Sequence, residues 1–425
     1  MSQPLSKYLD LLNREIPAHY RETLRPAAGQ LGFPFIVPGS KQYADVLWDW
    51  DAWLSNVGLG QVLYNLNDEA ATAEALPHEQ GCVLNYIQFA QRNLAWLGFI
   101  PGVLRAEAKA FPKDPFKGNP HKPCLAQHAA FIVRRHQEDV SWLVEQDALY
   151  TMQTLLNYYK AHRCHKETGL FLMDGPGNGG PDDDPTVFCR PSLSTATIFL
   201  NSMMYREILA LVYLLKLAGQ EESAGFWQQD ADALLAAIRE HCYDDRDGFF
   251  YSFDVNLLPE TPNDWYHSGR HRHWPGLIMR IETWMGFMPL WAGIATPEQA
   301  DRVVEHYRDE RTFNCPAGVR TLSKREKMYL IRTSGNPSCW LGPVWGASNY
   351  LTWRGLVRYG FEKEARELAE KTVLTFGRDM EKCGALHEYY EPSGEPMLNP
   401  GFQNWNHLVL QMAAYLEERE VIFDS

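Results

Sequence analysis

Helical periodicity dominates the pattern of hydrophobic and polar positions along the chain. Apolar residues recur at i, i+3, i+4 and i+7 over 142–163 and 194–217, which predicts two long amphipathic helices. Similar patterns predict helices over 50–66, 82–97, 224–241, 277–294, 297–309, 343–359, 362–379 and 401–416. Thr296-Pro297-Glu298 supplies a capping hydroxyl, a first-turn proline and an early acid for one of them. Strand-like segments such as 248–253 are few and short, so the pattern predicts an all-α fold.

A weak internal repeat refines this prediction. The segments 164–171, 242–250 and 387–394 each follow a long helix, contain an acidic turn with glycine and continue as a hairpin-like insert. Repeated helix pairs over a chain of this length predict an (α/α)6 barrel, a toroid of helical hairpins, as a single domain over 1–425. A solenoid and a large bundle are the alternatives, but a solenoid needs stricter repeats. In a toroid, the loops at one end surround a central pocket.

Composition adds a hint about the ligand. Of 425 residues, 40 are Lys or Arg and 53 are Asp or Glu, giving a formal net charge of −13. This acidic balance argues against nucleic-acid and anionic-membrane partners, which require basic surfaces. Aromatic residues make up 13% and include 14 tryptophans. Indole faces and carboxylates together favour a small carbohydrate ligand, although packing in the core is the commoner use of tryptophan.

The distribution of cysteine and of apolar residues bears on the compartment. No basic segment followed by an apolar stretch is visible near the start, and no run of eighteen apolar residues occurs. The eight cysteines are scattered without a CxxC pair, so neither a zinc site nor a disulfide framework is expected. We therefore expect reduced thiols in a cytoplasmic protein, with a single disulfide left open. Oligomeric state is not readable from the sequence.

The loop from Met173 to Pro191 is the first candidate for chemistry. It is rich in glycine and proline and contains the consecutive acids Asp182, Asp183 and Asp184, whose mutual repulsion makes an ordered loop costly. A functional role is therefore favoured over a solvated acidic loop. Calcium binding is a minor hypothesis, because hard oxygen ligands cluster here, but the spacing is not that of an EF-hand.

A second acidic constellation, 386–392, places Glu388 among tyrosines just after a predicted helix. Cleaving a glycosidic bond needs one protonated carboxyl group beside the leaving oxygen and one ionised carboxylate to activate water. Asp182 and Glu388 are far apart in sequence, yet in a toroid both lie on loops facing the same axis. Glu391 and Glu395 are rival candidates for the base.

Three aromatic motifs complete the candidate site: Trp48 to Trp53, Cys339 to Trp345 and Gly401 to His407. Alternating Trp and Asp in the first motif provide faces that stack on a sugar and carboxylates that accept hydrogen bonds from adjacent hydroxyls. The second motif presents two indoles where Gly-Pro opens a helix. Taken alone, each motif is more often part of a core than of a site.

Together these pieces resemble the clan of glycoside hydrolases that holds family 63, which includes processing α-glucosidases and mannosylglycerate hydrolases, and family 37, the trehalases. The matching pieces, in order, are Trp50-Asp51, Lys122 to Gln127, Gly180 to Pro185, Trp340 to Trp345, Glu388-Tyr389-Tyr390 and Gly401-Phe402. The resemblance implies an (α/α)6 barrel, with Asp182 as the general acid and Glu388 as the general base. The substrate-binding residues implied or expected are Trp48, Trp50, Asp51, Gln127, Arg190, Trp340, Gly342, Trp345, Tyr390 and Trp405.

This chain also departs from the family pattern. Leu341 stands where an arginine is common, Thr186 takes the usual place of an arginine that Arg190 could replace, and the trehalase form of the acid motif is absent. The departures leave the substrate open and weaken a trehalase assignment. Because the large β-domain of processing glucosidases is missing, the compact mannosylglycerate-hydrolase type is nearest in size.

The function expected is that of an inverting, exo-acting α-glycosidase that releases a terminal α-glucose or α-mannose without metal or organic cofactor. The alternative is a sugar epimerase or isomerase of the same architecture, which would use histidines such as His267, His271 and His273 as acid and base. Loops about 173–191 and 251–276 are expected to shape or cover the pocket. Arg270 or Arg272 in the second loop could bind an anionic aglycone such as glycerate, and a solvated surface loop is an equally good interpretation.

Overall fold

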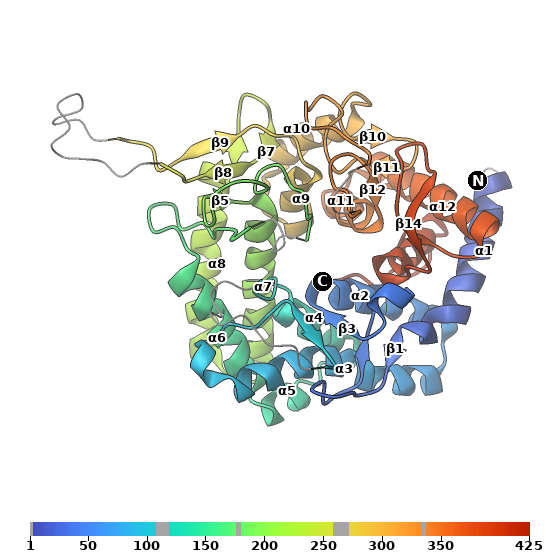
Figure 1. Ribbon diagram of the computed structural model, residues 1–425, viewed down its shortest axis with the longest axis horizontal. Helices are drawn as coiled ribbons and strands as arrows, with labels where there is room; N and C mark the ends of the chain where they lie inside the picture. The colour runs from blue at the N-terminus through green and yellow to red at the C-terminus, as the bar shows by residue number, and fades with distance from the viewer. Residues whose placement is uncertain (1–2, 108–118, 176–179, 258–271, 333–336) are drawn as a thin grey trace.

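Helices arranged in two concentric rings form the body of the molecule (Figure 1). The computed structural model describes residues 3–107, 119–175, 180–257, 272–332 and 337–425. The inner helices are α2 (Asp49–Leu66), α4 (Leu125–Arg135), α7 (Ile198–Leu217), α9 (Met288–Ala292), α11 (Gly346–Arg358) and α13 (Val409–Leu416). Each contacts the next, and α13 returns to contact α2, so the inner ring is closed. The fold is the predicted (α/α)6 barrel.

The outer helices pack against this ring in alternation with the inner ones. They are α1 (Gln3–His19), α3 (Glu69–Arg92), α6 (Ala148–His162), which follows the short α5 (Ser141–Glu145), α8 (Glu221–His241), α10 (Pro297–Arg308) and α12 (Glu362–Cys383). Burial explains the alternation. In α10 only Ala300, Val303, Val304 and Tyr307 are buried, which is one helical face, whereas α2 is buried on all sides over most of its length.

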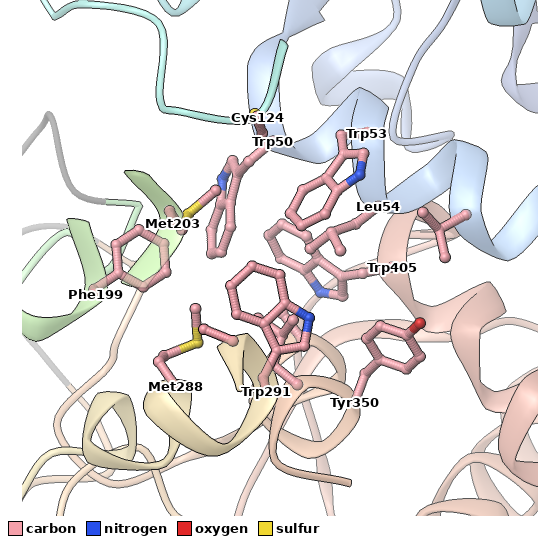
Figure 2. Packing of buried hydrophobic residues seen from close by; sticks show 14 of the residues in the cluster. Trp50, Trp53, Leu54, Cys124, Phe199, Met203, Met288, Trp291, Tyr350 and Trp405 are labelled. Atoms are coloured by element: carbon pink, nitrogen blue, oxygen red, sulfur yellow. The ribbon is translucent and has the colours of Figure 1, made fainter. Parts of the chain in front are cut away.

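Large aromatic side chains fill the interior where the inner helices converge. Trp53 of α2 and Trp291 of α9 are fully buried and meet edge to face, with ring centroids 6.1 Å apart. Figure 2 shows Trp50, also of α2, gathered around them with Trp405 of the 3₁₀ turn η7 (Asn404–Leu408) and Phe199 of α7. Most of the aromatic composition therefore serves packing between helices, as the commoner use of tryptophan predicts.

The loops between the helices contain short antiparallel strands. The three repeat segments all form hairpins: Cys164 bridges to Phe171, β6 (Tyr243–Asp244) pairs with β7 (Phe249–Phe250), and β13 (His387–Tyr390) pairs with β14 (Pro396–Pro400). The remaining strands are β1 (Leu24–Arg25), β2 (Phe35–Ile36), β3 (Val46–Trp48), β4 (Val103–Arg105), β5 (Thr195–Ala196), β8 (Ser252–Asp254), β9 (Leu277–Met279), β10 (Asn314–Cys315), β11 (Gly318–Val319) and β12 (Val344–Trp345). The predicted hairpin-like inserts are thus confirmed.

The helix predicted over 277–294 is wrong in its first half. Residues Leu277–Met279 form β9 on the edge of β8, and the helical part is a 3₁₀ turn, η6 (Trp284–Phe287), followed by α9. Gly286 and Pro289 limit the helix: Gly286 is helix-weakening, and Pro289 is tolerated because it lies in the first turn of α9. The predicted start of α10 is confirmed, since the Thr296 hydroxyl accepts from the Gln299 amide in a capping box.

Two helices were not predicted. One is α1, whose buried residues Leu5, Leu9, Leu12 and Ile16 lie on one face. The other is α4, in which every residue from Leu125 to Val133 is buried, the polar Gln127 and His128 included. Within the described residues, α7 is the one helix long and apolar enough to cross a membrane, and 78% of its most apolar window is buried inside the protein. The eight cysteines are free thiols.

Candidate active site

A cavity of about 280 Å³ opens among loops that carry the predicted acids and indoles. Its walls come from five stretches of chain. They are the segment before α2 with the first turn of that helix, Lys122, the acidic loop, the segment before α11, and the hairpin β13–β14 with the turn that follows it. The lining residues are Gln42, Tyr43, Trp48, Trp50, Asp51, Lys122, Gly180, Asp182, Pro337, Ser338, Trp340, Trp345, Glu388, Leu398, Phe402 and Trp405. Residues from both ends of the chain meet here because the toroid closes between α13 and α2.

Glu388 is held by two hydrogen bonds inside this cavity. It lies on β13 and is 4% exposed. The Tyr43 hydroxyl donates to its Oε1 at 3.2 Å, and the Asn399 amide donates to its Oε2 at 2.8 Å. Burial raises the pKa of Glu388, these two hydrogen bonds oppose the rise, and the negative charge of Asp182 adds to it. The carboxylate is therefore oriented at both oxygens.

Asp182 is half-buried at the cavity wall, while its two acidic neighbours secure the loop. The Trp340 amide donates to Asp183 Oδ1 at 2.8 Å, which ties the loop to the segment before α11. Asp184 accepts from the amide and hydroxyl of Thr186 at 2.9 Å and 2.8 Å. Burial raises the pKa of Asp183 and of Asp184 to about 6. Of the three consecutive acids, Asp182 is thus the one presented to the cavity.

Asp51 is the third carboxylate of the cavity. It lies in the first turn of α2, and the Asn404 amide donates to its Oδ1 at 2.7 Å. The Ser55 hydroxyl fixes that amide by donating to its oxygen at 2.7 Å. Burial raises the pKa of Asp51 to about 7, against the lowering effect of Lys122. Asp51 can therefore accept from a ligand hydroxyl through the oxygen that Asn404 leaves open.

Lys122 supplies the positive charge at the cavity wall. Its ammonium forms a buried ion pair with Asp49 Oδ1 at 2.9 Å and lies 5.8 Å from the centre of the Trp50 ring. Its backbone amide also donates to Asp49 Oδ2 at 2.8 Å. These bonds hold the ammonium group next to the Trp50 indole. Its positive charge offsets part of the negative charge of the cavity carboxylates.

Stacked indoles form the apolar wall. Trp340 and Trp345 lie parallel with centroids 4.1 Å apart and an angle of 8°. Trp50 and Trp405 are 5.0 Å apart at 56°. The buried indole nitrogens of Trp48 and Trp405 have no hydrogen-bond partner in the described part of the chain, so both N–H groups can donate to a ligand.

A glycine allows the acidic loop to approach this wall. Gly180 has φ +87°, and a Cβ on it would lie 2.8 Å from Cζ2 of Trp50. Both the left-handed backbone and the close contact exclude a larger side chain. The Gly-Pro-Asp motif therefore has a physical basis: the glycine lets the loop that carries Asp182 pack against Trp50 in the cavity wall.

The structure brings together eight of the predicted site residues in one cavity: Trp48, Trp50, Asp51, Asp182, Trp340, Trp345, Glu388 and Trp405. Four predicted residues do not line it: Gln127, Arg190, Gly342 and Tyr390. The rival bases Glu391 and Glu395 do not line it either. Glu391 pairs with Arg332 at 2.6 Å, and Glu395 pairs with Lys382 at 3.4 Å.

Each of the four displaced residues has another partner. The Gln127 amide donates to the carbonyl of Pro123 at 2.6 Å, and Arg190 pairs with Asp254 at 2.7 Å. The Gly342 amide donates to the Thr321 hydroxyl at 3.1 Å. The Tyr390 hydroxyl donates to the buried Asp379 at 2.9 Å. The polar groups of these four residues form hydrogen bonds or ion pairs with other parts of the protein and do not face the cavity. Their role is therefore structural.

The two loops expected to shape the pocket differ. The first contributes Gly180 and Asp182, with residues 176–179 outside the described part. From the second, the described residues 251–257 and 272–276 contribute no lining residue. Arg270, His267 and His271 lie outside the described residues. Arg272 pairs with Glu167 at 3.3 Å, away from the cavity.

Several lining residues were missed from the sequence. Lys122 and Phe402 lie inside two of the motifs that resemble the glycoside hydrolase families, so the sequence did contain information that could have identified them. Tyr43 lies in a 3₁₀ turn, η2 (Lys41–Tyr43), and Asn399, which holds Glu388, lies in β14; no local pattern marks either residue. Their contacts with Glu388 depend on tertiary structure. Tyr43 and Glu388 lie near opposite ends of the chain, and they meet because the ring of helices is closed.

A closed helical toroid whose axial cavity combines three carboxylates with indole walls is the arrangement of carbohydrate-processing enzymes, and of glycoside hydrolases in particular. Residues 44–405 match the family described as "Mannosylglycerate hydrolase MGH1-like glycoside hydrolase domain", and the chain belongs to this family.

Individual relatives include trehalases and mannosylglycerate hydrolases. A cytosolic neutral trehalase of Kluyveromyces lactis is 25% identical over 257 residues, covering 58% of this chain, and a probable trehalase of Eremothecium gossypii is 28% identical over 429 residues, covering 88%. The chain spans only 30% and 53% of the length of these two proteins. The mannosylglycerate hydrolase MGH1 of Selaginella moellendorffii is 23% identical over 399 residues, which cover 81% of this chain and 75% of that protein.

Solved structures agree with the fold. The GH63 mannosylglycerate hydrolase from Thermus thermophilus in complex with glucose has a TM-score of 0.64 at 18% identity, covering 95% of this chain and 98% of that one. The neutral trehalase from Saccharomyces cerevisiae has a TM-score of 0.62 at 17% identity, covering 90% and 74%.

Proposed function

We propose that this protein is an inverting, exo-acting α-glycosidase that releases a terminal α-glucose or α-mannose from a small glycoside. The observation that carries the proposal is the meeting of Asp182 and Glu388, from distant loops, in one indole-walled cavity. Membership of a glycoside hydrolase family supports the reaction class. A volume of about 280 Å³ is at the small end of ligand sites, which suits one sugar ring and therefore attack at a chain end.

In the proposed mechanism, the two carboxyl groups divide the work. Asp182 in its protonated form donates its proton to the glycosidic oxygen as the bond to C1 breaks. Glu388 in its ionised form removes a proton from a water molecule, and that oxygen attacks C1 from the opposite face. The bonds from Tyr43 and Asn399 hold both oxygens of Glu388, so that the base is aligned before the substrate binds.

Substrate binding is assigned to the remaining lining groups. Trp340 and Trp345, which stack on each other, line the wall that the sugar ring contacts, and Asp51 accepts from its hydroxyls. The indole N–H groups of Trp48 and Trp405 donate to sugar oxygens. Three of the fungal trehalase relatives are named cytosolic, which supports a cytoplasmic location for this enzyme as part of the proposal.

The test is a substrate screen followed by product stereochemistry. Purified protein is incubated with α-glucosides, α-mannosides, trehalose, mannosylglycerate and glucosylglycerate, and released sugar is measured. Proton NMR of the best substrate should show the β-anomer as the first product. An α-anomer formed first would contradict inversion, and release of no sugar from any α-glycoside would contradict the function.

The screen also addresses the epimerase alternative. That chemistry uses histidine as acid and base, and the described residues that line the cavity include no histidine. His273, from the loop expected over 251–276, lies at a separate surface hollow beside His241. Incubation with free mannose or glucose should therefore leave the monosaccharide unchanged.

A further inference from the structure

Three metal-ligating side chains meet behind the strand that carries Glu388, outside the cavity. They are Asp379, Cys383 and His387, and one ligand atom from each lies within 4.8 Å of the others. Asp379 is buried, His387 is partly buried and Cys383 is exposed. The cluster therefore has a fixed inner side and an open outer side.

Local structure explains why these residues converge. Asp379 and Cys383 are four residues apart in the last turn of α12, so they lie on the same face of the helix. Gly384 then ends the helix with φ +65°, and the chain turns back into β13, which begins with His387. The spacing Asp-x3-Cys-x3-His is not a CxxC pattern, so the cysteine spacing alone does not indicate a metal site.

Asp379 is oriented in the way that metal-binding carboxylates are. Its Oδ2 accepts from the Tyr390 hydroxyl at 2.9 Å and from the His387 backbone amide at 3.0 Å. Its two oxygens also lie 3.0 and 2.9 Å from Nδ1 of His387. Hydrogen bonds of this kind from outside the ligand set fix a ligand's direction and are a regular part of metal sites.

We propose that Asp379, Cys383 and His387 form a binding site for a zinc-type divalent ion. A thiolate, an imidazole and a carboxylate are the ligands that Zn²⁺ prefers, whereas Ca²⁺ and Mg²⁺ prefer oxygen alone. Zinc takes four ligands in a tetrahedron, and the exposed side of the cluster leaves the fourth position to water. Bonds of roughly 2.0–2.3 Å require the three atoms to draw together by about 1 Å, which the exposed Cys383 side chain supplies by rotation.

Binding exchanges protons for the metal. The Cys383 thiol loses its proton to solvent on forming the sulfur–metal bond. When His387 and Asp379 both bond to the ion in place of their contact with each other, the proton that they share is released to solvent as well. Because His387 directly precedes Glu388 in β13, the ion joins the end of α12 to the strand that carries the proposed base. The site itself does not depend on the proposed glycosidase activity.

The test is a titration of the full-length, EDTA-treated protein with Co²⁺, followed by displacement with Zn²⁺. One cobalt ion per chain should bind with a near-ultraviolet sulfur-to-cobalt charge-transfer band, and zinc should abolish the band. C383S should remove the band and weaken zinc binding by about 10-fold or more, on the scale seen for disturbed metal sites. C189S is the matched control, because Cys189 and Cys383 are the two exposed cysteines. It should bind as the parent does.

A second variant tests the orientation of the carboxylate. Y390F keeps the three ligands but removes one hydrogen bond to Asp379, and it should weaken zinc binding by about 10- to 100-fold. The proposal is overturned if the parent shows no sulfur–cobalt band, or if C383S binds zinc as tightly as C189S. Unchanged binding in Y390F would overturn the assignment of Asp379 as a ligand.

Discussion

At the scale of single residues, the two oxygens of Glu388 show how the cavity tunes a carboxylate. Burial favours the neutral acid, while donors at each oxygen favour the carboxylate. Tyr43 and Asn399 therefore oppose the effect of enclosure and of the negative Asp182. The balance leaves the pKa of Glu388 raised, so this carboxylate takes up a proton at a higher pH than an ordinary glutamate does.

The first prediction concerns the two proposed catalytic carboxylates. D182N and E388Q should each lower kcat by about 10²–10⁴-fold, because each removes proton transfer in the transition state. Initial rates on the best α-glycoside measure the effect. Thermal unfolding should show both variants folded, since each amide has nearly the same size and shape as the carboxyl group it replaces.

The control for this pair is the neighbouring acid. Glu391 follows Glu388 closely but pairs with Arg332 rather than lining the cavity, so E391Q should keep near-parental rates. Near-normal turnover in D182N or E388Q, or a loss in E391Q equal to that in E388Q, would contradict the assignment of the two roles.

The second prediction uses the hydrogen bond from Tyr43. Y43F removes a donor that stabilises the carboxylate, so the pKa of Glu388 should rise further and the acidic limb of kcat/KM should move to higher pH. A hydrogen bond to a charged group contributes roughly 1.5–3 kcal/mol and one pH unit corresponds to roughly 1.4 kcal/mol, so a shift of about 1 unit is expected.

A pH–rate profile of the parent and of Y43F measures this shift. If the acidic limb stays in place while KM alone rises, Tyr43 contacts the substrate but does not act on the base. A shift toward lower pH would contradict the sign of the argument.

Sequence reasoning identified the functional candidates that lie within short motifs. Asp182, Glu388 and the paired indoles could be found because they stand in the motifs 180–185, 388–390 and 340–345, whose order along the chain carries the family resemblance. It failed for Tyr390, which shares a motif with Glu388 but has its hydroxyl bound to Asp379 and its ring stacked on Phe376 at 4.9 Å. Glu388 faces the cavity and Tyr390 does not because of how β13 pairs with β12 and β14. The sequence pattern predicted a hairpin-like insert there but not the register of its strands.

At the scale of elements, periodicity predicted helices well where one face is solvated, as in α10 and α12. It was weakest for inner helices such as α4 and α9, because α4 is buried over most of its length, its polar Gln127 and His128 included, and α9 has only five residues. The strand β9 was assigned to a helix because three apolar residues fit either period. Pairing with β8, a tertiary contact, decides its conformation.

The third prediction concerns the loop that carries Asp182. In G180A the left-handed backbone costs about 1–2 kcal/mol, and the new methyl group would overlap Trp50. The loop must shift, so kcat/KM should fall about 10-fold or more through misplacement of the acid. Steady-state kinetics measure the loss.

Gly219 provides a matched control for this variant. It has φ +72°, and no atom lies within 4 Å of the position that a Cβ would take, so G219A carries backbone strain without the clash. Both variants should show lower thermal stability, but G219A should keep its activity. Equal activity in the two variants would show that the contact between Gly180 and Trp50 is unimportant.

At the scale of the whole molecule, a buried charge joins the segment after α13 to the inner ring. Asp424 accepts from Arg354 of α11 at 2.7 Å and from the Trp291 indole of α9 at 2.8 Å. Figure 1 places the C-terminus near the middle of the ring. Burial alone would raise the pKa of Asp424, but Arg354 and Arg206 outweigh it and lower the pKa to about 2.

The fourth prediction is that D424N destabilises the whole fold. The amide keeps the shape but leaves Arg354 buried without its counter-charge, and breaking a buried pair from one side costs roughly 3–5 kcal/mol of unfolding free energy. Urea unfolding at neutral pH measures the loss. D309N is the control, because Asp309 pairs with the exposed Arg311 and Arg325 at the surface, where a pair contributes about 1 kcal/mol or less.

The same variant has a defined pH dependence. The native pKa of Asp424 is below that of an unfolded aspartate, so its stabilising effect is complete above about pH 4 and is lost as the pH falls toward 2. The difference in unfolding free energy between the parent and D424N should therefore be constant from neutral pH to about pH 5 and should narrow below about pH 4. A difference that stays constant down to about pH 2 would mean that the carboxylate charge is not what joins this segment to the ring, and that shape alone accounts for the loss.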